Sequence, residues 1–221
     1  MKYIDFHSHV LPNADHGSDS RELSLQQITT AESYGIATVV ATPHFYPHKH
    51  KVDDFIMRRN SAYESIKNDV NIDVVLAAEI LVCDGIDKLD GIDKLCIGNT
   101  NALLLELPFA DFREEYVRAI ENIIAKGYRV ILAHADRYAP ENIEILLELG
   151  AVIQLNASPL SRFSVKKHLY DWIQRDKVVG IGSDIHMSDF KAYKKYDKAR
   201  KKLGATFDKI MDRSKDILTK Q

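Results

Sequence analysis

The stretch YIDFHSH, residues 3–9, begins as a short apolar run and ends on two histidines separated by one residue. Most of the apolar runs that follow are nearly continuous Val, Ile, Leu and Ala, without alternating polar positions. This pattern is typical of strands that are covered on both faces, as in a parallel sheet. The seven runs cover residues 3–7, 37–41, 74–80, 102–107, 130–133, 152–155 and 178–181.

Longer segments with helical periodicity separate these runs. Alternation of strand and helix predicts an α/β fold, and polar residues placed at the strand ends favour a distorted seven-stranded (β/α)7 TIM-like barrel over an open sheet. No linker divides the chain, so we expect residues 1–221 to form a single domain. The expected helices cover residues 21–34, 53–68, 112–126, 141–149, 161–175, 193–203 and 207–218.

The composition excludes several classes of protein. Hydrophobic residues make up 45% and charged residues 28% of the chain, which excludes collagen-like and fully disordered chains. The formal charge is −2 and no long block of like charge occurs, so we expect neither nucleic-acid binding nor membrane insertion. There is no apolar export segment, and the only cysteines are Cys83 and Cys96, so we expect reduced thiols and a cytoplasmic location.

The hexapeptide DGIDKL occurs twice in tandem at residues 84–95. Its period of six matches neither a helix nor a strand, and it lacks the alternating aspartates of a calcium loop. We expect a solvated short-helix or loop insertion after the third strand.

Histidines and carboxylates stand at or just after the carboxyl ends of the apolar runs. In a parallel barrel all of these ends open on one face. His7 and His9 alternate in the manner of a strand, so both imidazoles point toward the same mouth. A lone histidine of this kind is more often structural, but the whole set converges on one bowl. It comprises His7, His9, Asp15, His44, Glu79, Glu106, His134, Asp184 and His186.

Such a set requires compensating cations, because an unpaired buried charge is very costly. Neutral imidazole with carboxylate suits Zn²⁺, Mn²⁺ or Fe²⁺, and nine ligands are too many for one ion. The sequence therefore predicts two or three divalent transition metals. Neighbouring cations lower the pKa of a shared water, so that hydroxide is available at neutral pH. No protein nucleophile is then needed, in agreement with the lack of a thiol-phosphatase loop or a Gly-x-Ser-x-Gly elbow.

Five motifs resemble, in order, those of the polymerase and histidinol phosphatase (PHP) family. They are DFHSH at 5–9, TPH at 42–44, AEI at 78–80, AH at 133–134 and SDIH at 183–186. Within that family, DHGS at 15–18, LE at 105–106 and HADRY at 134–138 are similar to the metal-dependent tyrosine-protein phosphatases of bacterial capsule and exopolysaccharide clusters. The resemblance covers essentially the whole chain. It implies a trinuclear centre, with Mn²⁺ as the first choice and Fe²⁺ or Zn²⁺ as alternatives.

The resemblance also implies how the ligands are divided among the metals, and it assigns Arg137 to the substrate phosphate. The first metal would be held by His7, His9 and Asp184. Glu106 and His134 would hold the second metal, and Glu79 would bridge it to the first. The third metal would be held by Asp15, His44 and His186.

Three positions depart from the pattern of this subfamily. They are His16 before Gly17, Asp136 where Glu is usual, and Lys191 where Arg is often found. Lys191 offers a point charge where Arg offers a bidentate fork, which bears on phosphate contact. His16 and Asp136 are candidate general acids, although a phenolate leaving group, with a pKa of about 10, needs little proton donation.

The loop at residues 45–51 is basic and aromatic and follows a predicted ligand at the rim of the bowl. It is either a receptor for a phosphorylated, Tyr-rich protein tail or an ordinary solvated loop. Phe109 offers a second apolar wall for a phenyl ring. The predicted substrate rim therefore consists of Phe45, Tyr46, His48, Lys49 and Phe109.

The main functional hypothesis is a metal-dependent phosphatase acting on phosphotyrosine in the tail of a bacterial tyrosine autokinase that controls capsule or exopolysaccharide synthesis. One alternative is a phosphatase acting on histidinol phosphate or another small monoester. Another is a metal-stabilised binding module without turnover, which the complete ligand set disfavours. The sequence leaves the oligomeric state open.

Overall fold

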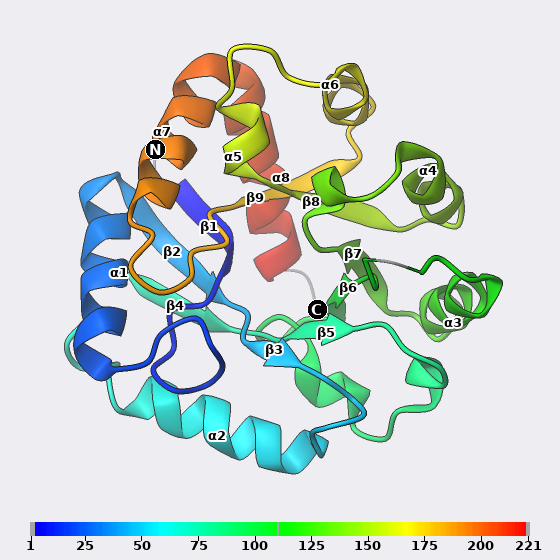
Figure 1. The fold of residues 1–221 in the computed structure, drawn as a ribbon, viewed down its shortest axis with the longest axis horizontal. Coiled ribbons are helices and arrows are strands. Elements are labelled where there is room, and N and C mark those ends of the chain that lie inside the picture. The colour runs from blue at the N-terminus through cyan, green and yellow to red at the C-terminus, as the bar shows by residue number, and fades with distance from the viewer. Residues whose placement is uncertain (1–2, 110, 220–221) are drawn as a thin grey trace.

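The strands form two parallel sheets in the computed structural model, which describes residues 3–109 and 111–219 (Figure 1). The first sheet has the order β1-β2-β4 and the second the order β3-β5-β6-β7-β8-β9. The prediction of an α/β fold with parallel strands is confirmed. The strands are β1 (Tyr3–Ser8), β2 (Ile36–Ala41), β3 (His44–Phe45), β4 (Asp73–Leu76), β5 (Glu79–Leu81), β6 (Ala102–Glu106), β7 (Arg129–Leu132), β8 (Val152–Asn156) and β9 (Val178–Gly182).

The described strands do not form the single closed ring of seven that we expected. The apolar run at 74–80 is split between β4 and β5, and β3 is an additional strand after β2. Pro43 contributes to the break, because it has no N–H to donate to a neighbouring strand. Backbone hydrogen bonds join the two sheets beside β1, from Asp184 N to His7 O (2.9 Å) and from His9 N to Ile185 O (3.2 Å). The first sheet therefore meets the segment after β9 along β1, and the chain passes from the first sheet to the second after β2 and again after β4.

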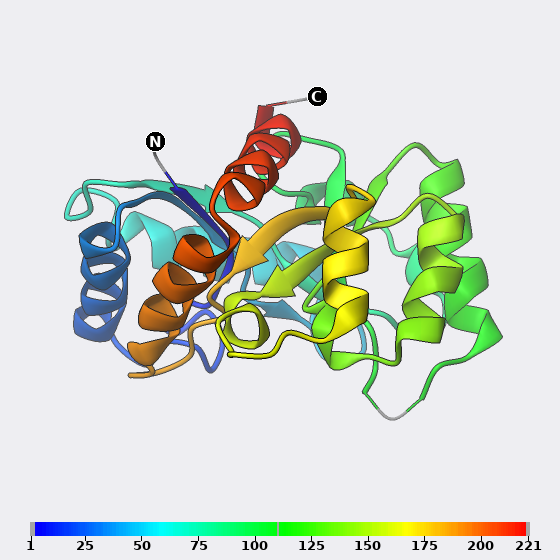
Figure 2. The same ribbon diagram turned by 90° about the horizontal axis from the view of Figure 1, so that it is seen from above.

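Helices surround the sheets (Figures 1 and 2). They follow the prediction closely, except that the expected helix at 53–68 ends at Glu64 and the expected helix at 161–175 begins only at Lys167. The Ser161 hydroxyl donates to Ser158 O (2.8 Å) at the end of the preceding short helix, and residues 161–166 form a loop. The helices are α1 (Arg21–Ser33), α2 (Val52–Glu64), α3 (Glu114–Ala125), α4 (Pro140–Glu148), α5 (Ala157–Leu160), α6 (Lys167–Gln174), α7 (Lys191–Leu203) and α8 (Ala205–Thr219).

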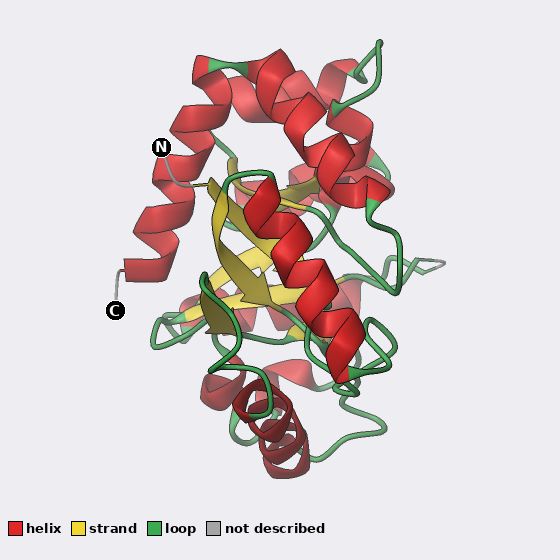
Figure 3. Ribbon diagram, turned by 90° about the vertical axis from the view of Figure 1, so that its left-hand side faces the viewer, coloured by secondary structure: helices red, strands yellow, loops and turns green. Residues whose placement is uncertain are grey.

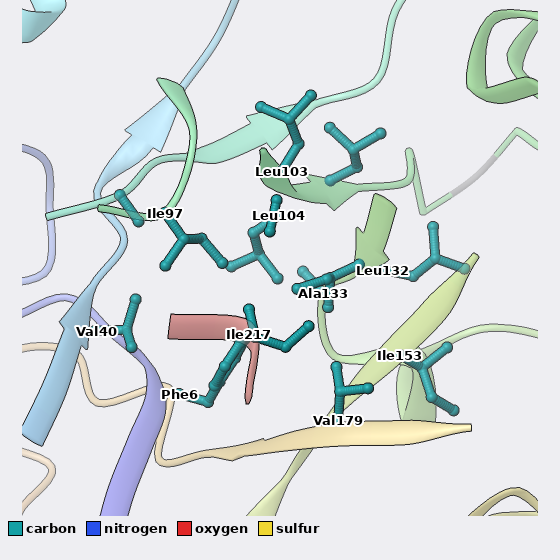
Figure 4. Close-up of a cluster of buried hydrophobic side chains, with 14 of the residues drawn as sticks. Phe6, Val40, Ile97, Leu103, Leu104, Leu132, Ala133, Ile153, Val179 and Ile217 are labelled. Atoms are coloured by element: carbon teal, nitrogen blue, oxygen red, sulfur yellow. The ribbon is translucent and has the colours of Figure 1, made fainter. Parts of the chain in front are cut away.

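Helix α8 packs against the amino-terminal end of β9. Ser214 Oγ donates to Val179 O (2.7 Å) and Arg213 Nε donates to Val178 O (2.8 Å). Ile217 of this helix lies among buried side chains of the strands, including Phe6 (Figure 4). Helices enclose the strands (Figure 3). Because α8 covers the amino-terminal end of β9, a site is expected at the carboxyl ends of the strands. Within the described residues, no helix combines the length and the apolar character needed to cross a membrane.

The tandem hexapeptide forms two copies of one small structure. Gly85 and Gly91 both have a positive φ, of 77° and 75°, and each is followed by a 3₁₀ turn, Ile86–Lys88 and Ile92–Leu95. The predicted short-helix insertion is confirmed, but the first isoleucine of each turn is buried, so the segment is not solvated throughout. The cysteines that flank it are free thiols, as predicted.

Candidate metal centre

The carboxyl end of β1 presents two buried histidines. His7 is fully buried and His9 is 1% exposed. Two glycines make room for them: a Cβ on Gly182 would lie 2.5 Å from His7 Cβ, and a Cβ on Gly17 would lie 2.0 Å from His9 Cβ. Strand β9 and the loop after β1 reach the histidines only because these two positions have no side chain.

Glu79, the first residue of β5, lies at the centre of the cluster. Its Oε2 atom is 3.1 Å from His7 Nε2 and 3.2 Å from His9 Nε2, and its Oε1 atom is 2.7 Å from His134 Nε2. Burial works to raise the pKa of Glu79, but His7, His134 and His9 bring it well below its usual value. The carboxylate is therefore ionised among three imidazoles.

These three imidazoles share one arrangement. In each, Nδ1 donates a hydrogen bond to a partner behind the ring, which directs Nε2 toward Glu79. Metal-binding histidines are commonly held in this way, because the outer hydrogen bond fixes the tautomer and the orientation of the ring. The pairs are His7 with Gln154 Oε1 (3.0 Å), His9 with Asp15 Oδ2 (2.6 Å) and His134 with the Tyr138 hydroxyl oxygen (3.4 Å).

Strand β8 contributes none of the predicted ligands, yet two of its side chains tie ligands together. Gln154 Oε1 also accepts the backbone N–H of His134 (2.6 Å), and Gln154 Nε2 donates to Asn156 Oδ1 (3.1 Å). Asn156 Nδ2 in turn donates to Asp184 Oδ2 (3.0 Å). Sequence reasoning missed both residues. The available signal was a pair of amides two residues apart at the end of an apolar strand.

The cluster attracts positive charge. Burial works against protonated His9, but Asp15 and Glu79 hold its pKa well above the usual value. Burial also opposes protonated His134, yet Glu106 and Glu79 raise its pKa to about 9. A donor set that draws protons onto imidazoles in this way also suits divalent cations, which compete with protons for the same lone pairs.

Two further histidines are held neutral, the form that binds metals. Burial lowers the pKa of His44 to about 3 and, together with His9, that of His186 to about 4. His44 Nδ1 is buried without a hydrogen-bond partner among the described residues, although Glu79 Oε2 is 3.1 Å away. An unpartnered imidazole nitrogen beside a carboxylate fits a metal ligand.

The structure brings the nine predicted ligands together, but Asp15 lies behind His9 and its two oxygens accept hydrogen bonds from the protein. Asp184 Oδ1 is 3.5 Å from His9 Nε2 and Glu106 Oε2 is 3.7 Å from His44 Nδ1. Asp15 also accepts the backbone N–H groups of His44 (2.9 Å) and Gly17 (2.8 Å). Potential ligand atoms come within 4.8 Å of one another in three sets: His9, His44 and His186; His7, His9 and Glu79; and His44, Glu79 and Glu106.

A cavity of about 480 Å³ opens over this cluster. Arg137 lines it and donates through Nη2 to Asp184 Oδ2. The Arg137 side chain is 37% exposed, so solvent reaches the guanidinium. The lining residues are His16, His44, Tyr46, Glu79, Glu106, Phe109, His134, Arg137, Asp184 and His186.

The candidate acids and Lys191 take different positions. His16 lines the cavity, and its ring stacks on His44 with 4.8 Å between centroids. Asp136 does not line it: its Oδ1 accepts the backbone N–H of Asn156 (2.7 Å), and burial raises its pKa. Lys191 is the exposed first residue of α7 and is not among the residues that line the cavity.

The predicted rim needs one correction. Phe45 is fully buried and packs edge-on against Phe55, with 5.1 Å between ring centroids, so it belongs to the core. Both residues of strand β3 are buried, so the Phe45 ring is enclosed even though it directly follows the cavity residue His44. Tyr46 and Phe109 do line the cavity.

The other rim residues lie beyond the cavity lining. His48 contributes to a neighbouring cavity beside the hexapeptide insertion. Lys49 Nζ lies 5.1 Å from the centroid of the Tyr46 ring, within the range of a cation–π contact.

A parallel α/β fold whose strand ends carry this cluster defines a class of proteins with a candidate site for divalent metal. The chain matches the family model described as "Capsular polysaccharide synthesis, CpsB/CapC" over residues 3–218, and it belongs to that family.

Individual relatives agree with this placement. The chain is 28% identical over 227 residues to the tyrosine-protein phosphatase CpsB of Streptococcus pneumoniae, covering 91% of both chains. It is 25% identical to the tyrosine-protein phosphatase YwqE of Bacillus subtilis, covering 83% of this chain and 77% of the relative. A solved structure from work on YwqE and CpsB, described as "unique metal-dependent tyrosine phosphatases", superposes with a TM-score of 0.81 at 21% identity, covering 99% and 95%. The last match concerns the fold.

Proposed function

We propose that this chain is a metal-dependent protein-tyrosine phosphatase. The observation that carries the proposal is the buried cluster around Glu79, where imidazoles and carboxylates from both sheets meet below one open cavity. The activity named for the relatives CpsB and YwqE supports the same conclusion and favours it over hydrolysis of histidinol phosphate. A binding module without turnover would not need this many converging ligands.

The nine converging residues would hold two or three divalent metals, with Mn²⁺ as our first choice and Fe²⁺ or Zn²⁺ as alternatives. When bound, the metals make water nucleophilic at neutral pH and balance the charge of the phosphoryl oxygens. Gln154, Asp15 and Tyr138 keep three ligand imidazoles in the required tautomer. We keep the division into three metals that the PHP resemblance implies, with Glu79 as the bridge.

We assign Arg137 to the substrate phosphate. Its guanidinium lies beside the predicted ligand Asp184 and faces the cavity. A phosphate that enters the cavity can accept hydrogen bonds from the remaining N–H groups of the guanidinium, in the bidentate manner typical of arginine. This contact would orient the phosphate toward the ligand cluster.

Tyr46 and Phe109 would contact the phenyl ring of phosphotyrosine. Tyr46 stacks on His44 with centroids 5.3 Å apart and 14° between the planes. Phe109 stacks on His134 with centroids 6.1 Å apart and 11° between the planes, and it is 64% exposed. Aromatic rings fixed on both sides of a ligand cluster favour an aromatic ester.

The proposed substrate is phosphotyrosine on a flexible protein tail, because a side chain displayed on an extended segment can enter an open cavity. We propose the tail of a tyrosine autokinase that regulates capsule or exopolysaccharide synthesis, in keeping with the family's description. His16, which lines the cavity, is the better placed general acid, since Asp136 accepts a backbone hydrogen bond outside the lining.

Metal removal tests the proposal. Protein purified without chelator should contain two or three transition-metal equivalents and hydrolyse a phosphotyrosine peptide. Chelation should abolish the hydrolysis, and Mn²⁺ or a related ion should restore it. Full turnover in the presence of chelator would show that the cluster is not the catalytic centre.

A further inference from the structure

Helix α7 carries a stripe of lysines along its exposed face. Lys191, Lys194, Lys198 and Lys201 follow one another at spacings of three and four residues, which places them on one side of a helix. All four are exposed. The opposite side of the helix is buried and anchors α7 to the fold through Tyr193, Tyr196 and two alanines.

The loop at 161–166 extends this basic face at the end of α7. Lys202 Nζ donates to Phe163 O (3.1 Å) and to Arg162 O, so α7 holds the loop beside it. Helices α5 and α7 lie next to each other in Figures 1 and 2. A further cavity, of about 560 Å³, lies between this loop and α7 and is lined by Ser161, Arg162, Phe163, Lys198, Lys201 and Lys202.

Phe163 is fully exposed, with a relative accessibility of 104%. No other described aromatic side chain outside the catalytic cavity is exposed to a comparable degree. An isolated phenyl ring in water gains no packing energy, and here it stands among cations. The ring therefore contributes little to the stability of this fold and is free to contact a partner.

The positive charge of this face is largely unneutralised. Helix α7 contains seven Lys and Arg residues and one acid, Asp197, although the whole chain has a formal charge of −2. Asp197 pairs with Arg200 (2.5 Å) and Lys201 (2.6 Å). Within residues 3–109 and 111–219, no acidic side chain lies at ion-pair distance from Lys194 or Lys198. The face is thus a concentrated positive patch on a weakly acidic protein.

We propose that α7 and the 161–166 loop form a docking face for an anionic lipid bilayer, with Phe163 inserted among the headgroups. Lysines on one helical face attract anionic headgroups, and a single aromatic ring gains energy at the boundary between headgroups and acyl chains. This face is separate from the phosphatase site, and the inference does not depend on the proposed activity. The docking face and the catalytic cavity have no lining residue in common.

A bilayer fits this surface better than a protein or nucleic-acid partner. A stable protein interface needs a well-packed apolar centre, and one ring surrounded by lysines does not provide it. Single-stranded nucleic acid is bound by several stacking rings along a groove, whereas this face has one. A bilayer needs only diffuse positive charge and a small inserted side chain.

Vesicle co-sedimentation of the full chain tests the proposal. The unmodified protein should bind vesicles made of an equal mixture of phosphatidylcholine and phosphatidylglycerol and should not bind vesicles of phosphatidylcholine alone. Added salt should weaken the binding, because it screens the lysines. Lys194→Gln with Lys198→Gln should lower the affinity by about fivefold for each lysine removed. The matched control is Lys51→Gln with Lys88→Gln, which removes the same charge from exposed positions away from α7 and should bind normally.

Substitutions of Phe163 test the inserted ring. Phe163→Ala should lower vesicle affinity by about fivefold or more without changing hydrolysis of a small aryl phosphate. Phe163→Trp should bind, and its emission should shift to the blue with the phosphatidylglycerol vesicles. The native Trp172 is fully buried and gives a constant background.

Several results would overturn the proposal. They are equal binding to both kinds of vesicle, no binding by the unmodified protein, or an equal loss in the control variant. The protein could fail to bind vesicles and instead bind single-stranded DNA, a phosphopeptide or a second copy of the chain through Lys194 and Lys198. In that case the face would be assigned to that partner.

Discussion

The floor and the rim of the catalytic cavity are built in different ways. The floor consists of His7, His9, Glu79 and His134, which are at most 1% exposed. The rim consists of His16, Tyr46 and Phe109, which lie in loops; Phe109 is 64% exposed. The three floor histidines are held from behind by hydrogen bonds to Nδ1, and they surround Glu79 at the start of β5. Rim side chains mainly stack on a neighbour. The strands therefore determine which ligands form the floor, and the loops determine which phosphate ester can reach it.

The largest expected effect comes from breaking the floor at its centre. Glu79→Gln removes the charge that four imidazoles surround, so it should abolish metal binding and lower kcat by more than about 10³-fold. Elemental analysis and phosphotyrosine-peptide turnover measure both effects. The control Glu148→Gln, at an exposed site on α4, should leave both unchanged. A Glu79→Gln variant with full metal content would contradict the role of the floor.

The next effect separates the phosphate contact from the metal ligands. Arg137→Ala should retain its metal and its fold but lose roughly 10²-fold in kcat/KM, the usual effect of removing one preorganised charge. The exposed Arg129→Ala is the matched control. Kinetics close to those of the unmodified protein in Arg137→Ala would remove this arginine from the mechanism.

A smaller effect tests whether the floor is held from behind. Gln154→Leu removes the acceptor for His7 Nδ1 and His134 N, so metal affinity should fall by about 10- to 100-fold. Metal titration of the chelator-treated protein measures this directly, independently of turnover. Gln174→Leu, on the exposed face of α6, is the control. Unchanged metal affinity in Gln154→Leu would mean that β8 has no part in ordering the ligands.

The smallest effect concerns the rim. Tyr46→Ala and Phe109→Ala should each lower kcat/KM by about two- to tenfold for a phosphotyrosine peptide, because one aromatic contact is lost. The loss should be smaller for a small activated aryl phosphate. Its aryloxide leaves readily, so hydrolysis depends less on how the ring is positioned. Equal losses for both substrates would show that the rim does not select the phosphotyrosine ring.

The sequence predicted the floor better than its surroundings. Most of the histidines and carboxylates were found because parallel strands bring their carboxyl ends together. His44 and Glu79 differ from this expectation, because they are the first residues of the short strands β3 and β5. Gln154 and Asn156 were missed because an amide in an apolar strand carries no metal signal by itself. The rim position of Phe45 was wrong because residues next to each other in a loop can face opposite ways, and burial of this ring depends on Phe55.

Long-range packing explains the remaining differences. The run at 74–80 looked like one strand, but the break at Pro43 in the neighbouring chain segment divides it between two sheets. The basic face was missed because charge was judged along the sequence. Arg162 and Lys198 are far apart in the chain and line one cavity only after folding.

The central claim is that one buried metal cluster hydrolyses phosphotyrosine. The most direct measurement is kcat/KM of the metal-reconstituted chain on a phosphotyrosine peptide and on histidinol phosphate, side by side, with and without chelator. We predict a higher value for the phosphotyrosine peptide and no turnover of either substrate in chelator. Preference for histidinol phosphate, or turnover of the peptide that survives chelation, would contradict the account.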